Sequence, residues 1–276
     1  MFKTLNALVL REVRYKEADR ILTLLTDTEG KITAKARGAL RKSSRTAAAT
    51  QQLTWSEMTL FENRGRFTVN EAVVKEGFEG LRGDMEKLAL GAYLAECLEA
   101  LSVEDQPEPA LLQLGLNCLY ALSRDLCPQE KIKAAFELRA MCLSGYTPEL
   151  GACAVCGKEP QEADLSLDYG RVVCRRCQGL GARVELGAAA FAALRYLSTA
   201  PAKQLLSFTL PEPDMGRLGV AAERYLLSRT ERGFSTLEYW KNIRKYTHPA
   251  QQVSPDGSSH PLYPDRPDPA VPPVNE

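Results

Sequence analysis

Histidine is scarce in this chain. Its 276 residues include two histidines, His248 and His260, and both follow residue 247. A histidine-based triad or a histidine-ligated catalytic metal is therefore excluded from the rest of the chain. Neither G-x-x-x-x-G-K-[ST] nor G-x-G-x-x-G occurs, so the sequence has no obvious nucleotide cradle. These absences favour binding over catalysis, and paired carboxylates of a metal-dependent nuclease stay open as an alternative.

Long hydrophobic runs are also missing near the start of the chain. The apolar run at residues 5–10 is far too short to cross a membrane. Arg11 and Glu12 close it, and no small-residue cleavage site follows. We therefore expect a cytoplasmic protein.

A net charge of one sign is lacking as well, because Lys plus Arg and Asp plus Glu both number 35. The charges are unevenly distributed along the chain. Residues 1–83 carry about five more cations than acids, whereas residues 84–150 carry about six more acids than cations. Residues 151–246 are again basic by about four charges. Two basic segments thus flank an acidic one.

The most informative basic stretch is residues 31–37, where polar and small apolar residues alternate strictly. A strand has a period of two, so one face would be polar and carry Lys31, Thr33, Lys35 and Arg37. The opposite face is left for a core. A flexible basic loop with Arg41, Lys42 and Arg45 follows, and no acidic residue occurs from position 30 to 56. A charge run is often only a solvated surface, but this arrangement can follow a sugar-phosphate backbone.

The whole of residues 1–81 has a β pattern. Five strands are predicted, at residues 3–13, 20–26, 31–37, 53–61 and 67–74. Five short strands fit a closed OB-fold barrel, a fold that binds single strands or oligosaccharides. Aromatic residues of the last hairpin are expected in the barrel core rather than as base-stacking platforms; they are Trp55, Phe61 and Phe67.

The hydrophobic period then changes to that of helices, which predicts an α+β protein. Residues 82–246 should form a helical domain that begins with three antiparallel helices and ends with three more. Ser235 and Glu238 are spaced as a capping box for the last helix. Residues 247–276 are rich in Pro, Ser and Asp, and we expect a disordered tail there.

Two Cys-x-x-Cys pairs interrupt the helical domain at about residues 150–180. Their spacing is that of a four-cysteine zinc site with the ligands Cys153, Cys156, Cys174 and Cys177. Redox-active dithiols are the alternative, but the βαβ context of such motifs is missing. The other four cysteines are expected to be reduced core residues; they are Cys97, Cys118, Cys127 and Cys142.

The N-terminal region also carries a recognisable set of stretches. They are Val13-Arg-Tyr15-Lys-Glu-Ala-Asp19-Arg20-Ile-Leu-Thr-Leu-Leu-Thr26, the pair Gly30-Lys31 and the basic loop at residues 38–45. Together they closely resemble the N-terminal signature of RecO, a family of bacterial recombination mediators. The resemblance covers about residues 1–246, and the proline-rich tail has no counterpart in the family pattern.

The resemblance implies a DNA repair and recombination protein without enzymatic turnover, associated with the nucleoid. RecO-like proteins bind single- and double-stranded DNA and anneal complementary strands. With RecR they help to load recombinase onto strands coated by single-strand-binding protein (SSB). The DNA-binding face of the family corresponds here to Lys31, Lys35, Arg37, Arg41, Lys42 and Arg45. Some members lack the cysteines, which fits a stabilising zinc ion better than a catalytic one.

Two other functions stay open from the sequence. A zinc-ribbon factor of transcription or translation would share the basic barrel and the cysteines, but it would bind specific sequences. A metal-dependent nuclease would cleave DNA when magnesium is added. A second possible DNA site is the basic segment with Arg171, Arg175, Arg176 and Arg183.

Overall fold

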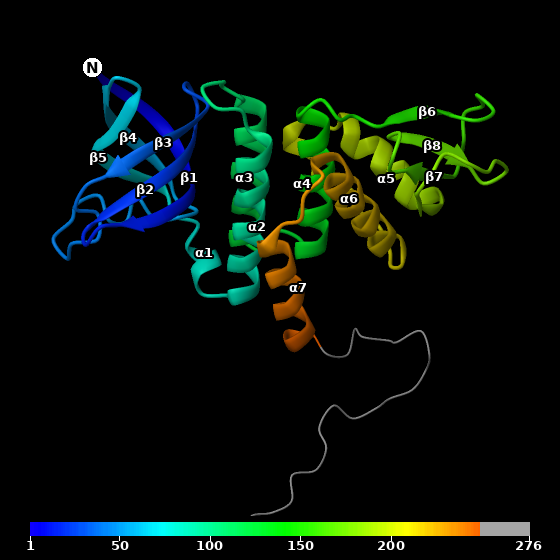
Figure 1. Cartoon of the computed structure of the whole chain (residues 1–276). Coiled ribbons are helices and arrows are strands. Elements are labelled where there is room, and N and C mark those ends of the chain that lie inside the picture. The colour runs from blue at the N-terminus through cyan, green and yellow to red at the C-terminus, as the bar shows by residue number, and fades with distance from the viewer. Residues whose placement is uncertain (249–276) are drawn as a thin grey trace, which may run out of the picture.

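The computed structural model of the chain describes residues 1–248 (Figure 1). A β-barrel, a group of helices and a small sheet follow one another across the molecule. The tail expected to be disordered lies outside the described residues, apart from Thr247 and His248. Helix α7 (Ser235–Thr247) includes the first of these two residues, so the helical domain ends slightly beyond the predicted position.

The prediction of a five-stranded barrel is confirmed. The strands close in the order β1-β2-β3-β5-β4, with β1 pairing with both β2 and β4. Their bounds are β1 (Phe2–Tyr15), β2 (Asp19–Thr26), β3 (Lys31–Ala36), β4 (Trp55–Asn63) and β5 (Arg66–Glu76). Along β3 the alternation works as expected, because the small apolar residues are buried inside the barrel and the polar ones face outward.

Strand β1 explains the apolar run at residues 5–10. Its first half pairs with β4 and its second half with β2, and a bulge lies between Val9 and Arg11. Leu5, Ala7 and Val9 belong to the barrel core. Leu8 and Leu10 instead pack into the core of the helical domain. The run is continuous from Ala7 to Leu10 because this part of β1 is buried on both faces, whereas Asn6 is half-buried.

The predicted helical domain is also confirmed. Helix α2 packs against α3 and α7, and α4 packs against α3 and α6. The helices are α1 (Glu79–Arg82), α2 (Met85–Leu101), α3 (Pro109–Ser123), α4 (Gln129–Leu143), α5 (Gly187–Thr199), α6 (Asp214–Thr230) and α7, with a short 3₁₀ helix η1 (Ala202–Gln204). Among the helices of residues 1–248, none combines the length and the hydropathy that a membrane crossing requires.

The capping box predicted for α7 is wrong. Ser235 is the first residue of the helix, and the preceding residue makes no side-chain cap. Glu96 of α2 accepts hydrogen bonds from both the main-chain N–H and the hydroxyl of Thr236 instead. A tertiary contact thus provides the acceptor for a main-chain N–H at the start of α7, a role that the capping box was expected to fill.

The sequence interpretation missed the small sheet around the cysteines. It has the order β6-β8-β7-β9 and lies at the far end of the molecule from the barrel (Figure 1). Its strands are β6 (Glu149–Cys153), β7 (Ala163–Ser166), β8 (Arg171–Cys174) and β9 (Arg183–Glu185). Strands of three to five residues carry too little periodicity to be seen in a sequence.

Candidate nucleic-acid interface and metal centre

The outward face of β3 carries the predicted cations, but they have different surroundings. Lys35 Nζ lies 2.9 Å from the Asp19 carboxylate of β2 and 4.8 Å from the ring centre of Tyr15. The hydrogen bond from Lys35, followed by one from the Gly38 main chain, lowers the pKa of Asp19. This pairing joins segments that are distant in sequence, so the absence of acids near Lys35 in the chain did not reveal it.

Lys31 lies at the other end of β3, at the seam between barrel and helices. Its ammonium donates to the main-chain carbonyl of Glu99 at 2.9 Å, and its own carbonyl accepts from Asp105 N–H at 3.2 Å. Close by, Arg11 pairs with Glu99 at 2.8 Å. The structure therefore engages Lys31 in holding the two domains together and does not bring it together with the basic loop.

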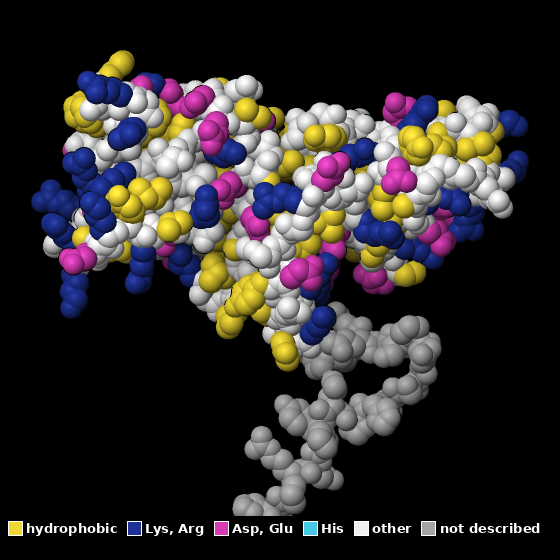
Figure 2. All heavy atoms as spheres, in the orientation of Figure 1, with side chains coloured by type: hydrophobic (Ala, Val, Ile, Leu, Met, Phe, Trp, Pro, Cys, Tyr) yellow, Lys and Arg dark blue, Asp and Glu magenta, His cyan; other side chains and the backbone are white. Residues whose placement is uncertain are grey.

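The basic loop itself leaves its cations exposed. Arg37, Arg41, Lys42 and Arg45 are all solvent-exposed. Within residues 1–248, none of their side chains forms an ion pair with a carboxylate. Figure 2 shows the corresponding gathering of Lys and Arg side chains on the left and lower left of the barrel.

The loop between β3 and β4 is a folded segment rather than the flexible one expected. Successive turns run through it, with main-chain hydrogen bonds such as Ser44 N–H to Arg41 C=O at 3.0 Å. The Arg20 guanidinium donates to the Ala47 carbonyl and to the Thr50 hydroxyl, which anchors the second half of the loop to the barrel. The cations of the first half are therefore held on a loop whose second half is fixed to the barrel.

Sequence reasoning missed an aromatic residue and a cation at the tip of the β1–β2 hairpin. Tyr15 is 43% exposed, and Lys16 Nζ lies 5.6 Å from its ring centre. The tip adjoins the basic loop, because Leu40 N–H donates to the Ala18 carbonyl. We call the resulting surface the cationic rim; its members are Lys16, Lys35, Arg37, Arg41, Lys42 and Arg45. The sequence signal was available, since Tyr15 and Lys16 stand in a turn between two predicted strands.

The second basic segment has a different electrostatic character. Arg171 pairs with Glu149 at 2.8 Å, and Arg183 lies 3.7 Å from Asp164. Arg175 pairs with two glutamates, at 2.9 and 3.3 Å. Three of the four arginines there are thus compensated by carboxylates, which leaves the cationic rim as the stronger anion-binding surface.

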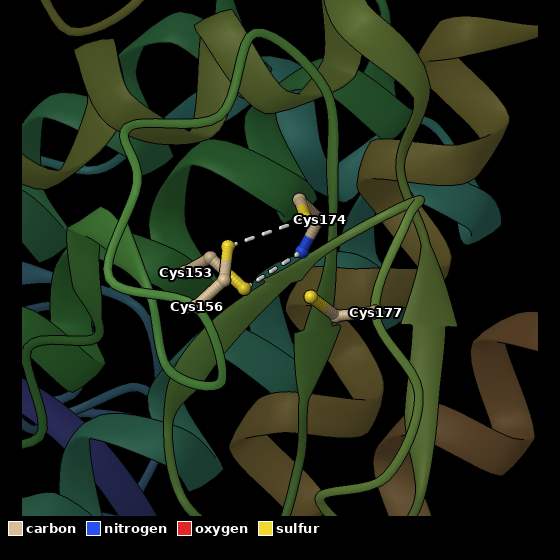
Figure 3. Close-up of side chains that lie close together, drawn as sticks. All are labelled: Cys153, Cys156, Cys174 and Cys177. Atoms are coloured by element: carbon tan, nitrogen blue, oxygen red, sulfur yellow. Dashed lines mark hydrogen bonds between the residues drawn. The ribbon is translucent and has the colours of Figure 1, made fainter.

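The four predicted metal ligands converge at the small sheet (Figure 3). Cys153 is the last residue of β6 and Cys174 is the last residue of β8, and these two strands pair in parallel. Each Cys-x-x-Cys turn therefore begins at the same end of this strand pair. At the first turn, Gly157 adopts φ +71° and its N–H donates to the Cys153 carbonyl. The pairing of β6 with β8 is what brings together cysteines that are distant in sequence.

The sulfur atoms fit a four-thiolate metal site. All four lie within 4.8 Å of one another, and the sulfurs of Cys156 and Cys174 are 3.9 Å apart. Around a tetrahedral ion with metal–sulfur bonds of about 2.3 Å, neighbouring sulfurs lie about 3.8 Å apart. The four cysteines can therefore hold one metal ion with little movement.

The pKa values of two of these thiols are shifted in opposite directions. Burial acts to raise the pKa of Cys153, but main-chain N–H groups of both turns donate to its sulfur and together lower the pKa to about 6. One of these donors is Cys174 N–H, at 3.4 Å. The hydrogen bond with the Cys174 sulfur raises the pKa of Cys177 to about 12. A bound cation would stabilise all four thiolates at once.

The other cysteines are free thiols of the helical domain. Cys97 and Cys118 are fully buried, and Cys127 and Cys142 are half-buried. Burial raises the pKa of each of these thiols above the ordinary value. They are therefore packing residues with little thiolate character.

The fold and the site together define an α+β protein in which an OB-fold barrel precedes a helical domain with a four-cysteine metal site. Two family models cover nearly all of residues 1–238. Recombination protein O N terminal matches residues 1–78, and Recombination protein O C terminal matches residues 82–238. The chain belongs to the RecO family.

Curated relatives agree with the family models. DNA repair protein RecO of Acetivibrio thermocellus is 33% identical over 240 residues, which cover 86% of this chain and 96% of that protein. DNA repair protein RecO of Symbiobacterium thermophilum is 34% identical over 254 residues, which cover 87% of this chain and 96% of that protein. The protein of the same name from Desulforudis audaxviator is 39% identical over 174 residues, or 63% of this chain and 69% of that protein.

Proposed function

We propose that this chain is a DNA repair and recombination mediator that binds single- and double-stranded DNA through the cationic rim. The observation that carries the proposal is the group of exposed, uncompensated cations on the basic loop, namely Arg37, Arg41, Lys42 and Arg45. Fixed cations without carboxylate partners attract phosphates and release counterions when they bind. Lys31 is left out of the proposed contact set, because its ammonium is already bound at the seam.

Binding of this kind does not read base sequence. Phosphate contacts position a nucleic acid but carry no sequence information. A protein that must act wherever DNA is damaged needs this property. It also separates the proposal from the zinc-ribbon factor, which would prefer particular sequences.

We propose zinc as the metal of the four-cysteine site, with a structural role. Zinc accepts four thiolates in a tetrahedral arrangement, and a site closed by four protein ligands has no position for a reacting water. Cys153, Cys156, Cys174 and Cys177 would hold it and tie β6 to β8. The metal then stabilises a sheet whose strands are too short to be stable alone.

We further propose that the chain anneals complementary strands and acts with RecR and SSB, without catalytic turnover, in the cytoplasm. Membership of the RecO family supports this proposal. The lack of histidine between residues 1 and 247 removes histidine-based catalysis from that part of the chain.

An annealing assay tests the proposal most directly. Complementary oligonucleotides, one of them coated with SSB, are mixed with the protein, and duplex formation is followed over time. The wild type should accelerate annealing, and a variant with Arg41→Ala and Lys42→Ala should be slower. Cleavage of the strands on addition of magnesium would favour the nuclease instead. No acceleration by the folded wild type would refute the proposal.

A further inference from the structure

A continuous row of residues crosses the outer face of the barrel beyond the cationic rim. The strand register places Phe2 of β1 opposite Phe61 of β4, and Phe61 opposite Thr68 of β5. Thr68 is in turn opposite Lys35 of β3. Residues directly opposite each other in a ladder share one face, so all of these side chains are on the outside. The row joins two aromatic rings to the cationic rim.

The two rings form an exposed pair. Phe2 is 58% exposed and Phe61 is 40% exposed, and their ring centres are 5.2 Å apart with a tilt of 53°. The expectation that the aromatic residues of the last hairpin lie in the barrel core is therefore wrong for Phe61, and also for Trp55, which packs against the helical core; it holds for Phe67. A pair of neighbouring exposed rings is therefore a candidate contact surface.

The charges around the pair favour an anionic ligand. Arg64 in the turn between β4 and β5 and Arg66 at the start of β5 are both exposed, three and five residues after Phe61. The nearest acid, Glu62, lies 3.1 Å from Lys3, which it shares with Glu29 at 2.8 Å, so Glu62 is partly compensated. Uncompensated acids begin only further along, with Glu71 opposite Thr59. Figure 2 shows hydrophobic side chains beside Lys and Arg at the upper left of the barrel, near the N-terminus marked in Figure 1.

We propose that Phe2 and Phe61 form a stacking platform for the unpaired bases of single-stranded DNA. This inference rests on the proposed DNA binding, and it adds a reason why the protein would bind single strands more tightly than duplexes. Lys35 lies two strands from Phe61, which corresponds to about 10 Å along the row. A strand whose phosphates contact Arg66 and the uncompensated cations of the rim, which Lys35 adjoins, can thus place a base on the rings. The bases of a duplex are already stacked on one another and cannot use the platform.

Aromatic stacking is a sequence-tolerant source of single-strand affinity, because every base has a flat face. The platform therefore suits a protein whose phosphate contacts also ignore sequence. An apolar segment of a protein partner is the competing occupant. If such a segment is the true occupant, removal of the rings would weaken its binding and leave the DNA affinity unchanged.

Replacing Phe61 with leucine is the main test. Leucine keeps an apolar side chain on the strand but removes the ring, so the fold should persist. Affinity of the full chain for a labelled oligo(dT) should fall by about 5- to 150-fold, while affinity for a duplex of equal length stays the same. The slope of log affinity against log salt should also be unchanged, since no phosphate contact is lost. Val73→Ala is the matched control, because Val73 is 66% exposed on β5 and lies opposite Glu57, outside the row.

A second variant reports on the contact itself. Phe61→Trp retains a ring, so it should keep single-strand affinity, and its added fluorescence should change on addition of oligo(dT) but not on addition of duplex. Unchanged oligo(dT) affinity in Phe61→Leu, or a Phe61→Trp signal that ignores oligo(dT), would overturn the platform.

The failure of the platform is distinguishable from a failure of the proposed function. Arg41→Ala with Lys42→Ala should weaken both single- and double-strand binding. If that variant loses affinity and Phe61→Leu does not, the rim binds DNA and the platform is refuted. If neither changes affinity, the rim is refuted as well.

Discussion

Replacing Arg41 and Lys42 with alanine removes two cations from the exposed half of the loop between β3 and β4. Both side chains are free of carboxylate partners within residues 1–248, so the replacement leaves no acid unpaired. Exposed substitutions of this kind usually change the free energy of unfolding by less than about 0.5 kcal/mol. The variant should therefore fold normally and differ from the wild type in DNA binding.

The magnitude follows from counterion release. Each phosphate contact contributes about 0.7 to the slope of log affinity against log salt for single strands, so two lost contacts reduce the slope by about 1.4. At about 0.1 M salt, this corresponds to roughly 25-fold weaker binding relative to a 1 M reference. The loss should be the same for different base sequences, because phosphates carry no sequence information.

Fluorescence anisotropy of a labelled oligo(dT), measured across a range of salt concentrations, gives both the affinity and its salt slope. Arg175→Ala is a suitable control, because Arg175, in the turn after β8, is ion-paired and lies outside the cationic rim. Lys31→Ala is a second control: it should lower the melting temperature through the loss of its bond to Glu99 while keeping the salt slope. A folded double variant with wild-type affinity and slope would refute the placement of the DNA site on the rim.

Three further predictions concern stability. Purified protein should contain about one zinc ion per chain, and Cys153→Ser should lose it and lower the melting temperature, as measured by metal analysis and thermal unfolding. Lys133→Ala should destabilise the helical domain by about 3–5 kcal/mol, because the fully buried Glu137 carboxylate, 2.8 Å from Lys133 Nζ, would lose its main cation. Denaturant unfolding measures this change. Gly30→Ala should cost at least about 1–2 kcal/mol, because Gly30 has φ +71° and a Cβ there would lie 2.2 Å from the Gln106 carbonyl oxygen.

Each of these outcomes has a clear opposite. Full metal retention in Cys153→Ser, or a wild type without zinc, would contradict the site. A Lys133→Ala variant as stable as a variant of an exposed ion pair, such as Arg195→Ala, would show that Glu137 is compensated by other groups. Unchanged stability in Gly30→Ala would show that the contact between barrel and helical domain readily adjusts.

Some features of this protein were fixed by local patterns in its sequence. The alternation along residues 31–37 determined the buried and exposed faces of β3, because a strand has a period of two whatever its neighbours. The spacing of the two Cys-x-x-Cys pairs likewise identified the metal site, since two cysteines separated by two residues can reach one ion from a single turn. The five strands and the change of period near residue 83 gave the barrel and the helices.

Other features depend on which distant segments meet, and only the tertiary structure decided them. Lys31 and Lys35 are equivalent in the strand pattern, yet the helical domain engages Lys31 and Asp19 engages Lys35. Phe2 and Phe61 become neighbours only because β1 closes the barrel against β4. The physical reason is the same in each case: period and spacing report on forces within one segment, whereas ion pairs and ring contacts depend on the register between segments.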